Sequence, residues 1–304
     1  SRGLGDVYKR QDPLEVYRLI DEESVTHMCC APTVLTSMYS IPNAAQQDLS
    51  GVTIMTAGAP PAPQVIRSME NMGAHVLHTY GLTETYGPTA ICAIQPDWKE
   101  KSPAEVANLK ARQGVAYVVA DTGMRVVDTE MNDVEKNGSQ MGEVVMNGNI
   151  VMSGYFNDQD ATSVAFEGGW FHSGDLAVWH PDGYIELKDR AKDIIISGGE
   201  NISSQEVEKV IMEHDGVLEV SVVGVPDERW GEVPKAFVVS REGVTVSEEE
   251  IVTFTRDRIA HFKAPKYVEF GELPKTATGK IQKYVLREKE WEGKEKRIQG
   301  SSLI

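Results

Sequence analysis

Over the first hundred positions, the spacing of apolar residues alternates between helical and strand-like periods. Leu14, Tyr17 and Ile20 are apolar at helical spacing, and Asp12 followed by Pro13 is typical of a helix N-terminus, so a helix is predicted to begin at Asp12. The pattern then predicts an apolar run at 25–31, a helix at 32–39, a strand at 52–57, a helix at 63–72 and a strand at 75–80. Alternating helices and strands indicate an α/β fold with a parallel, doubly wound sheet.

Short apolar runs replace this alternation between about 113 and 190. Runs at 125–127, 143–146 and 184–187 are divided by Gly, Asn and Asp, and His180-Pro181-Asp182-Gly183 is typical of a hairpin turn. This texture predicts a β-rich subdomain.

The last region combines helix caps with strand-like runs. Ser203 or Ser204 and Ser247 are candidate helix caps, and Glu250 completes a capping box with Ser247. Strand-like runs at 220–225 and 236–239 lie between these helices, which predicts a small α+β domain. The mixed charges of 287–297 indicate a solvated helix face.

These textures predict three parts. Residues 1–11 form an unmatched leader, which we treat as a cloning, assembly or gene-model remnant and exclude from the fold. Residues 12–191 form a doubly wound domain, with an α/β layer at 12–112 and the β-rich subdomain at 113–191. Residues 192–304 form the small α+β domain.

Composition restricts the function classes. Hydrophobic residues make up 41% and charged residues 25% of 304 residues, as in globular proteins. Thirty Lys and Arg against 46 Asp and Glu give a net charge of −16, which opposes binding to nucleic acid or anionic membranes.

The sequence carries no membrane-spanning or secretory pattern, so we expect an intracellular protein, whether cytoplasmic, peroxisomal or mitochondrial. The terminal Ser301-Ser302-Leu303-Ile304 lacks the lysine and terminal leucine of the peroxisomal signal. The oligomeric state is left open. Cys29, Cys30 and Cys92 are expected as buried core or pocket lining without a metal or redox role.

Two loops at predicted strand ends carry candidate chemistry. Residues 57–60 and 80–84 would both lie beyond the carboxyl ends of parallel strands, where ligands of such sheets bind. Tyr80, Thr83 and Glu84 offer an aromatic face, a hydroxyl and a carboxylate for a base, a phosphate and Mg²⁺. Taken alone, the second loop is equally compatible with an ordinary turn.

Three later segments are ambiguous one by one. Asp175 is suited to accept hydrogen bonds from ribose hydroxyls, although Gly-Asp pairs are common in turns. Residues 189–201 form a charged, polar segment at the boundary between the β-rich subdomain and the α+β region. Such a segment fits either a hinge or an exposed loop. Residues 274–280 lack the first glycine of a Walker loop and are followed by Ile281, which leaves Lys280 as a compact cation for a phosphate or carboxylate.

Together these segments have the order and spacing of one family. The chain resembles the adenylate-forming acyl-CoA synthetases from about residue 12 to 287. The matching segments are Thr56-Ala57-Gly58-Ala59-Pro60, Tyr80-Gly81-Leu82-Thr83-Glu84, Ser173-Gly174-Asp175, Asp189-Arg190-Ala191-Lys192-Asp193 with Gly198-Gly199-Glu200-Asn201, and Pro274-Lys275-Thr276-Ala277-Thr278-Gly279-Lys280. Residues 79–88, 111–114 and 183–204 are most similar to the acyl-activating group of plant benzoate/butyrate ligases and bacterial methylmercaptopropionate ligases.

The resemblance implies an AMP-forming acid–thiol ligase that uses ATP, Mg²⁺ and coenzyme A and acts on a fatty or aromatic carboxylic acid. It implies catalytic roles for Lys280, Thr83 and Glu84, with Glu84 binding Mg²⁺ and Lys192 serving as the hinge. The residues implied to bind ATP or AMP are Gly58, Ala59, Pro60, Thr79, Tyr80, Gly81, Thr83, Asp175, Arg190 and Lys280. Those implied to bind CoA are Gly198, Gly199 and Trp230, although Trp230 is also compatible with a core position.

The acyl pocket is expected around the run 28–32 and Gly58, and at His78, Gly81, Leu82 and Pro88. His78 fits a packed, hydrogen-bonded side chain equally well. No acid faces a substrate ammonium in this set, which disfavours amino acid substrates.

The chain departs from the family pattern because the Gly/Ser/Thr-rich phosphate loop has no counterpart in it. We therefore expect an N-terminally truncated synthetase in which residues 12–191 are the C-terminal part of a large doubly wound adenylate-forming domain, and whose isolated chain is impaired. Two alternatives stay open: an adenylating enzyme that loads a carrier protein, and a non-catalytic nucleotide-binding relic.

Overall fold

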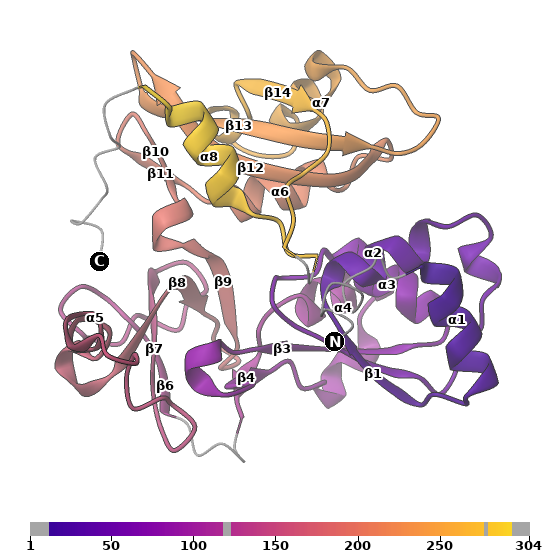
Figure 1. Cartoon of the computed structure of the whole chain (residues 1–304), viewed down its shortest axis with the longest axis horizontal. Helices are drawn as coiled ribbons and strands as arrows, with labels where there is room; N and C mark the ends of the chain where they lie inside the picture. The colour runs from indigo at the N-terminus through magenta and orange to yellow at the C-terminus, as the bar shows by residue number, and fades with distance from the viewer. Residues whose placement is uncertain (1–11, 118–122, 277–278, 294–304) are drawn as a thin grey trace, which may run out of the picture. The chain divides into compact units, whose positions relative to one another are not determined.

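A computed structural model describes residues 12–117, 123–276 and 279–293 (Figure 1). The chain divides into two compact units. Unit 1 comprises 1–173, 177–187 and 277–280, and unit 2 comprises 174–176, 188–276 and 281–304. The main division therefore falls after Leu187, four residues before the boundary expected after residue 191.

Unit 1 begins with the expected α/β alternation. Its first elements are α1 (Pro13–Glu22), β1 (His27–Cys30), α2 (Pro32–Ser40), β2 (Thr53–Thr56), α3 (Pro63–Asn71) and β3 (His75–Tyr80). The Asp12 carboxylate accepts a hydrogen bond from Leu14 N at 3.0 Å, so the expected cap is present. Strands β1, β2 and β3 pair in parallel, which confirms the α/β fold class.

The sheet continues with two antiparallel strands, β4 (Ala90–Ile91) and β5 (Val115–Ala116), so it is mixed rather than wholly parallel. The chain reverses soon after β3, where Thr89 N donates to Tyr80 O at 2.7 Å, and so short a connection can join only antiparallel strands. Helix α4 (Pro103–Lys110) precedes β5. Ser102 and Glu105 form its capping box, a signal that the sequence analysis missed.

The β-rich region confirms the expected change of texture. Strands β6 (Gly123–Val127), β7 (Met141–Asn147), β8 (Phe171–Trp179) and β9 (Ile185–Arg190) form one four-stranded sheet. The expected hairpin turn joins β8 to β9, where His180 N donates to Tyr184 O at 2.8 Å. Helix α5 (Gln159–Ala165), capped by Asp158, lies in the chain between β7 and β8 and was not predicted.

Unit 2 is a small α+β fold. Its elements are β10 (Ile195–Ser197), β11 (Glu200–Ile202), α6 (Ser204–Ile211), β12 (Val217–Asp227), β13 (Gly231–Ser240), α7 (Glu248–Arg256), β14 (Tyr267–Phe270) and α8 (Lys283–Trp291). The strand order is β11-β10-β13-β12, and β14 pairs in parallel with β13. Ser203 caps α6, and Ser247 caps α7 with Glu250 in the expected capping box.

Short 3-10 helices connect several of these elements. They are η2 (Ala44–Gln46), η3 (Thr83–Thr85), η4 (Pro96–Glu100), η6 (Glu167–Gly169), η7 (Ala191–Asp193) and η8 (His261–Lys263).

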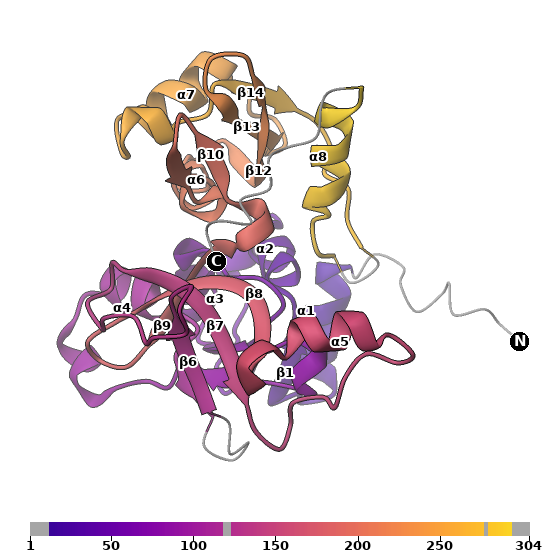
Figure 2. The same ribbon diagram turned by 90° about the vertical axis from the view of Figure 1, so that its left-hand side faces the viewer.

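The sheet of unit 2 buries both of its faces. Val220 and Val222 pack with residues of α6 and α7, whereas Val223 and Val225 pack with Leu286 of α8. This division follows from the strand period, because successive side chains point to opposite faces. Figure 2 accordingly shows α6 and α7 on one side of β12 and β13, and α8 on the other.

One expectation was wrong. Cys29 is exposed rather than buried, because β1 directs adjacent side chains to opposite faces and only Cys30 packs against the helices. Helix α8 covers the first part of the 287–297 stretch, and Glu288 and Lys289 are exposed on it, whereas Leu286 before the stretch is buried and Trp291 Nε1 donates to Gly224 O at 3.0 Å. Residues 294–297 of that stretch lie outside the described residues.

Candidate nucleotide and thioester site

The loops that follow β2 and β3 start from the same edge of the sheet. Thr56 and His78 are register partners in these parallel strands, so the two carboxyl ends lie side by side. Gly58, Ala59 and Pro60 are exposed in the first loop, and Gly58 has φ +92°, a conformation that favours glycine. This placement agrees with the position at which parallel sheets bind ligands.

The end of β3 is tightly packed. Thr79 is 2% exposed, and its hydroxyl finds no hydrogen-bond partner within the described part of the chain. The ring of Tyr80 is buried in the cluster that includes Ala90 and Met146. A Cβ at Gly81 would lie 2.1 Å from the carbonyl oxygen of Gly87, so only glycine fits there. A ligand that bonds the Thr79 hydroxyl would satisfy an otherwise unpaired buried group.

Thr83 and Glu84 lie in η3, with Thr83 exposed and Glu84 half-buried. The Tyr155 hydroxyl donates to Glu84 Oε1 at 3.1 Å. Burial and the neighbouring carboxylate raise the pKa of Tyr155, so its hydroxyl keeps the proton that it donates. Met152 N also donates to the backbone oxygen of Glu84 at 2.7 Å. Sequence analysis missed Tyr155 because the pair is separated by 71 residues and no local pattern links them.

His78 is a packed histidine. Its side chain is buried, and burial lowers its pKa to about 4, so the ring is neutral near pH 7. Nδ1 lies 2.9 Å from the backbone oxygen of Arg112 and therefore donates the hydrogen bond. Leu82 and Pro88 are half-buried in the following turn. The role of His78 as acyl-pocket lining stays a prediction.

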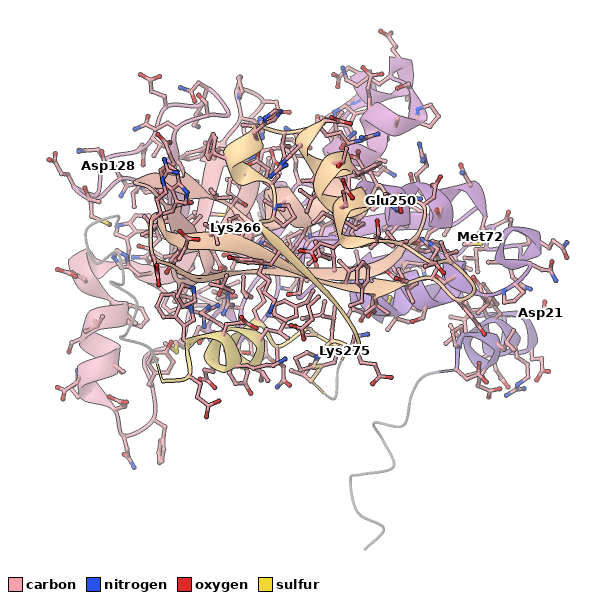
Figure 3. The ribbon with its side chains drawn as sticks, turned by 90° about the horizontal axis from the view of Figure 1, so that it is seen from above. Asp21, Met72, Asp128, Glu250, Lys266 and Lys275 are labelled. Atoms are coloured by element: carbon pink, nitrogen blue, oxygen red, sulfur yellow. The ribbon has the colours of Figure 1, made fainter. Side chains whose placement is uncertain are left out.

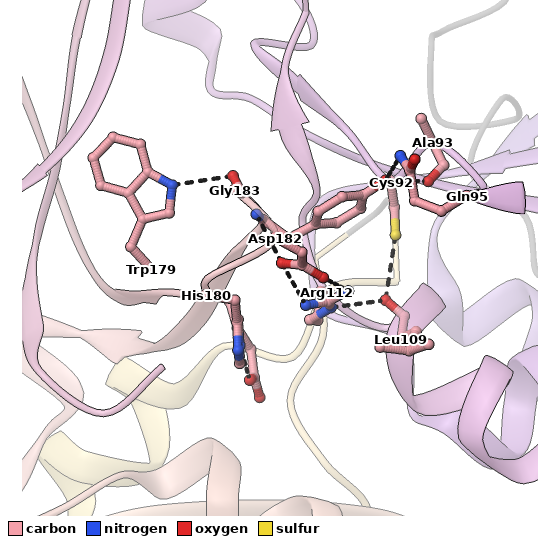
Figure 4. Close-up of polar contacts among 11 residues, drawn as sticks. Cys92, Ala93, Gln95, Leu109, Arg112, Trp179, His180, Asp182 and Gly183 are labelled. Carbon is pink, nitrogen blue, oxygen red and sulfur yellow. Dashed lines mark hydrogen bonds and ion pairs between the residues drawn. The ribbon is translucent and has the colours of Figure 1, made fainter. Parts of the chain in front are cut away.

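The partner of His78 is itself held in place by a polar network (Figure 4). The Arg112 guanidinium forms two hydrogen bonds to the Asp182 carboxylate, at 2.8 and 3.2 Å. It also lies 4.5 Å from the ring centroid of Tyr184. The turn between β8 and β9 thus fixes the backbone on which His78 depends.

The structure brings Asp175 and Arg190 together. Arg190 Nε lies 3.2 Å from Asp175 Oδ1, and the Asp175 side chain is 8% exposed while that of Arg190 is 41% exposed. A carboxylate that pairs with a guanidinium through one oxygen can still accept further hydrogen bonds. These were the two residues expected to hold the ribose hydroxyls.

Gly198, Gly199 and Trp230 form a second group. The loop between β10 and β11 turns through Gly198 and Gly199, with φ of +60° and +89°. Gly198 N donates to Trp230 O at 2.8 Å, and a Cβ at Gly198 would lie 2.7 Å from the indole. Trp230 is 45% exposed beneath Arg229, so it is not a core tryptophan.

Two lysines complete the expected set. Lys192 is exposed in η7, and Lys280 is exposed directly after Gly279, whose φ is +86°. Residues 277 and 278 of the same segment lie outside the described residues.

Two properties of the described residues concern metal binding and membrane spanning. Within residues 12–117, 123–276 and 279–293, no group of three or more His, Cys, Asp or Glu is arranged to hold a metal ion. None of the described helices has the length and apolar character needed to cross a bilayer.

An α/β layer with candidate ligand loops at its strand ends, followed in sequence by a small α+β fold, fits the resemblance to the adenylate-forming enzymes. Comparison with known proteins agrees. The family model of the AMP-binding enzymes matches residues 5–156, and that of the AMP-binding enzyme C-terminal domain matches 206–280. The chain belongs to the family of AMP-binding enzymes.

Several members of this family are similar to the chain. Acetate–CoA ligase CCL3 of Humulus lupulus is 53% identical over 282 residues, which are 90% of this chain and 50% of that protein. 4-Hydroxybutyrate–CoA ligase 2 of Metallosphaera sedula is 50% identical over 273 residues, 90% of this chain and 49% of that protein. The anthranilate CoA ligase AuaEII, solved with anthranoyl-AMP, superposes with a TM-score of 0.79 at 26% identity, covering 91% of this chain and 52% of its own. The chain thus spans about half the length of the relatives it matches.

Proposed function

We propose that this chain is part of an ATP-dependent acid–thiol ligase that forms an acyl-adenylate and then an acyl-CoA. The observation that supports the proposal is the common sheet edge from which the loops after β2 and β3 start. Relatives at 50–53% identity are named CoA ligases, which supports the same chemistry here.

In the first step an oxygen of the substrate carboxylate attacks the α-phosphate of ATP, and pyrophosphate leaves with the electrons of the broken bond. Gly58, Ala59 and Tyr80 bind the adenine in this proposal, Thr83 donates to a phosphate, and Asp175 with Arg190 holds the ribose. Pro60, Thr79 and Gly81 complete the nucleotide contacts. Negative charge grows on the α-phosphate as the carboxylate attacks, so the Lys280 ammonium stabilises the transition state more than bound ATP.

In the second step the sulfur of coenzyme A attacks the acyl carbon, AMP departs, and the thiol proton is released. The exposed indole of Trp230 and the Gly198–Gly199 turn offer an apolar wall and a backbone without side chains, which suit a narrow pantetheine arm. Lys192 serves as the pivot between the two steps.

Glu84 is the residue that would bind Mg²⁺. Its carboxylate fits this ion, because Mg²⁺ prefers oxygen ligands and is usually held by one or two carboxylates together with substrate phosphates. The Tyr155 hydroxyl orients Glu84 by its hydrogen bond to Oε1. A bound Mg²⁺ would neutralise phosphate charge.

We propose a carboxylic acid with an apolar acyl group as the substrate. The expected pocket residues near β3 are a neutral histidine, a glycine, a leucine and a proline, and none of them carries a charge to pair with a substrate ammonium. Fatty and aromatic acids both fit this chemistry.

Calorimetric titration of the chain with AMP tests the nucleotide site. We expect saturable binding that Asp175→Ala abolishes, because the ribose hydroxyls lose their acceptor. Asp257→Ala is the control, since it removes an exposed carboxylate at the end of α7. A folded chain that binds no AMP, or one whose binding survives Asp175→Ala, would contradict the proposal.

A second experiment tests whether coenzyme A or a carrier protein accepts the acyl group. Product formation from a panel of acids should require coenzyme A, whereas a carrier-loading enzyme would release only acyl-adenylate until its carrier protein is supplied.

A further inference from the structure

Lys283 stands at a junction of three elements of unit 2. It is the first residue of α8, and its ammonium lies 2.8 Å from Glu208 Oε1 and 2.5 Å from Ser204 Oγ, both on α6. Glu208 Oε1 also accepts a hydrogen bond from Val222 N of β12 at 2.7 Å. Because α6 and α8 cover opposite faces of the sheet, this ion pair ties them together past the edge strand β12.

Asp189 adds a second carboxylate to this junction. It is 2% exposed, and its Oδ2 accepts from Ser204 N, in the first turn of α6, at 2.6 Å. Burial raises the pKa of Asp189 and of Glu208. Burial by itself would lower the pKa of Lys283, but the two carboxylates outweigh it and raise that pKa, so the lysine stays charged. The Lys283 and Glu208 side chains are each only 19% exposed, so removing one partner leaves the other charge largely shielded from water without its counter-ion. Moving Lys283 away from this junction would therefore cost free energy.

The other side of the Lys280 segment is held as well. Lys275, labelled in Figure 3, pairs with Glu219 of β12 at 2.6 Å. Lys275 also forms an isolated antiparallel bridge with Ile281, and Gln282 N donates to Pro274 O at 2.8 Å. The residues that flank Lys280 are thus fixed to the sheet of unit 2 before and after it.

We propose that Lys283 is a positioning residue for Lys280: by anchoring the first turn of α8 to Glu208 and Ser204, it holds the catalytic ammonium, three residues earlier, where adenylation needs it. This inference rests on the proposed function. Lys283 itself touches no substrate. Its effect should be confined to the step that uses Lys280, because displacement of a catalytic group by about 1 Å can cost about 10²-fold in rate.

The test compares Lys283→Met with Lys289→Met. Lys289 lies on the same helix and is 63% exposed in its pair with Glu269, so its loss removes a charge without touching the junction. The variants are made in a protein that carries this chain together with a phosphate loop. ATP–pyrophosphate exchange measures adenylation, and transfer from a supplied acyl-adenylate to coenzyme A measures the second step. We expect Lys283→Met to lower kcat of adenylation by about 10²-fold with the KM for ATP and the transfer step unchanged. Lys289→Met should leave all three values unchanged, and Lys283→Arg should restore part of the loss.

Hydrogen exchange of the chain provides a readout that does not depend on activity. Lys283→Met should lose protection in peptides covering 272–276 and 281–285, while β12 and β13 keep theirs. Equal slowing of both steps, or lost protection throughout the sheet, would assign the cluster to folding alone and overturn the inference. Unchanged adenylation and exchange would overturn it too. Where Lys283→Met does not fold, Glu208→Gln removes the same ion pair and keeps an acceptor for Val222 N.

These outcomes are separable from failure of the proposed function. In a protein that carries this chain together with a phosphate loop, AMP binding without either half-reaction would contradict the ligase activity, and the exchange pattern would still decide whether Lys283 anchors the segment.

Discussion

At the scale of single residues, burial changes what a side chain can do. His78 is neutral because burial lowers its pKa to about 4, whereas the same residue in an unfolded chain titrates near 6.5. The unfolded state therefore binds more protons between these two pH values, and stability must fall as pH falls through that window. Above about pH 6.5 the contribution of His78 is fully present.

We predict that the free energy of unfolding of unit 1 decreases by roughly 3 kcal/mol from this histidine alone between pH 6.5 and 4. Urea denaturation at several pH values measures it, with His78→Gln as the reference, because glutamine can still donate to Arg112 O but does not titrate. Parallel pH profiles for the two proteins would contradict the assigned burial.

Residue identities were predictable from the sequence where a motif is local, and not where a contact is long-range. The motifs identified Glu84 and Asp175 as candidates, but no pattern could reveal that Tyr155 holds Glu84 or that Lys283 reaches Glu208. Such contacts depend on how strands and helices are brought together, which spacing along the chain does not encode.

At the scale of elements, the loop between β10 and β11 depends on a glycine for two reasons. Gly198 has φ +60°, and a Cβ there would meet the indole of Trp230 at 2.7 Å. Gly243 has φ +76° with nothing within 4 Å, so it shares only the first constraint. Gly198→Ala should therefore cost about 1–3 kcal/mol more than Gly243→Ala, because it also displaces the indole.

Urea denaturation of both variants gives the difference, and intrinsic fluorescence should change in Gly198→Ala only. Equal destabilisation of the two variants would show that the Trp230 side chain can move aside without lowering the free energy of unfolding.

Helices with a clear capping residue were predicted well from the sequence. Asp12, Ser203 and Ser247 all cap helices as expected, since a cap is a local hydrogen bond between neighbours in the chain. Helix α5 was missed because only seven residues form it and none is buried, so it carries no apolar period. Strand β4 has two residues and is defined only by its pairing with β3.

At the scale of the whole molecule, the two units have separate cores. The clusters around Ile54 and Met146 belong to unit 1, and those around Val222 and Phe237 belong to unit 2, with no residue in common. Chains of this kind commonly depart from two-state unfolding. We predict two calorimetric transitions.

Ser247→Ala should assign one of them. Loss of the cap of α7 costs about 1 kcal/mol and should lower only the transition of unit 2, by about 4 °C. His78→Gln should move only the other transition. A single transition that both variants shift would show that the units unfold together.

The contact between Asp189 and Ser204 also governs how the molecule can be divided for expression. A fragment cut at residue 192, where the sequence texture changes, would leave behind Asp189, which accepts from the first turn of α6, and Asp175, which pairs with Arg190. Lys283 would then keep Glu208 and Ser204 but lose the neighbouring Asp189 carboxylate. A fragment that starts before residue 174 retains all of these partners, so gene boundaries for unit 2 should follow its side-chain contacts rather than the change in composition.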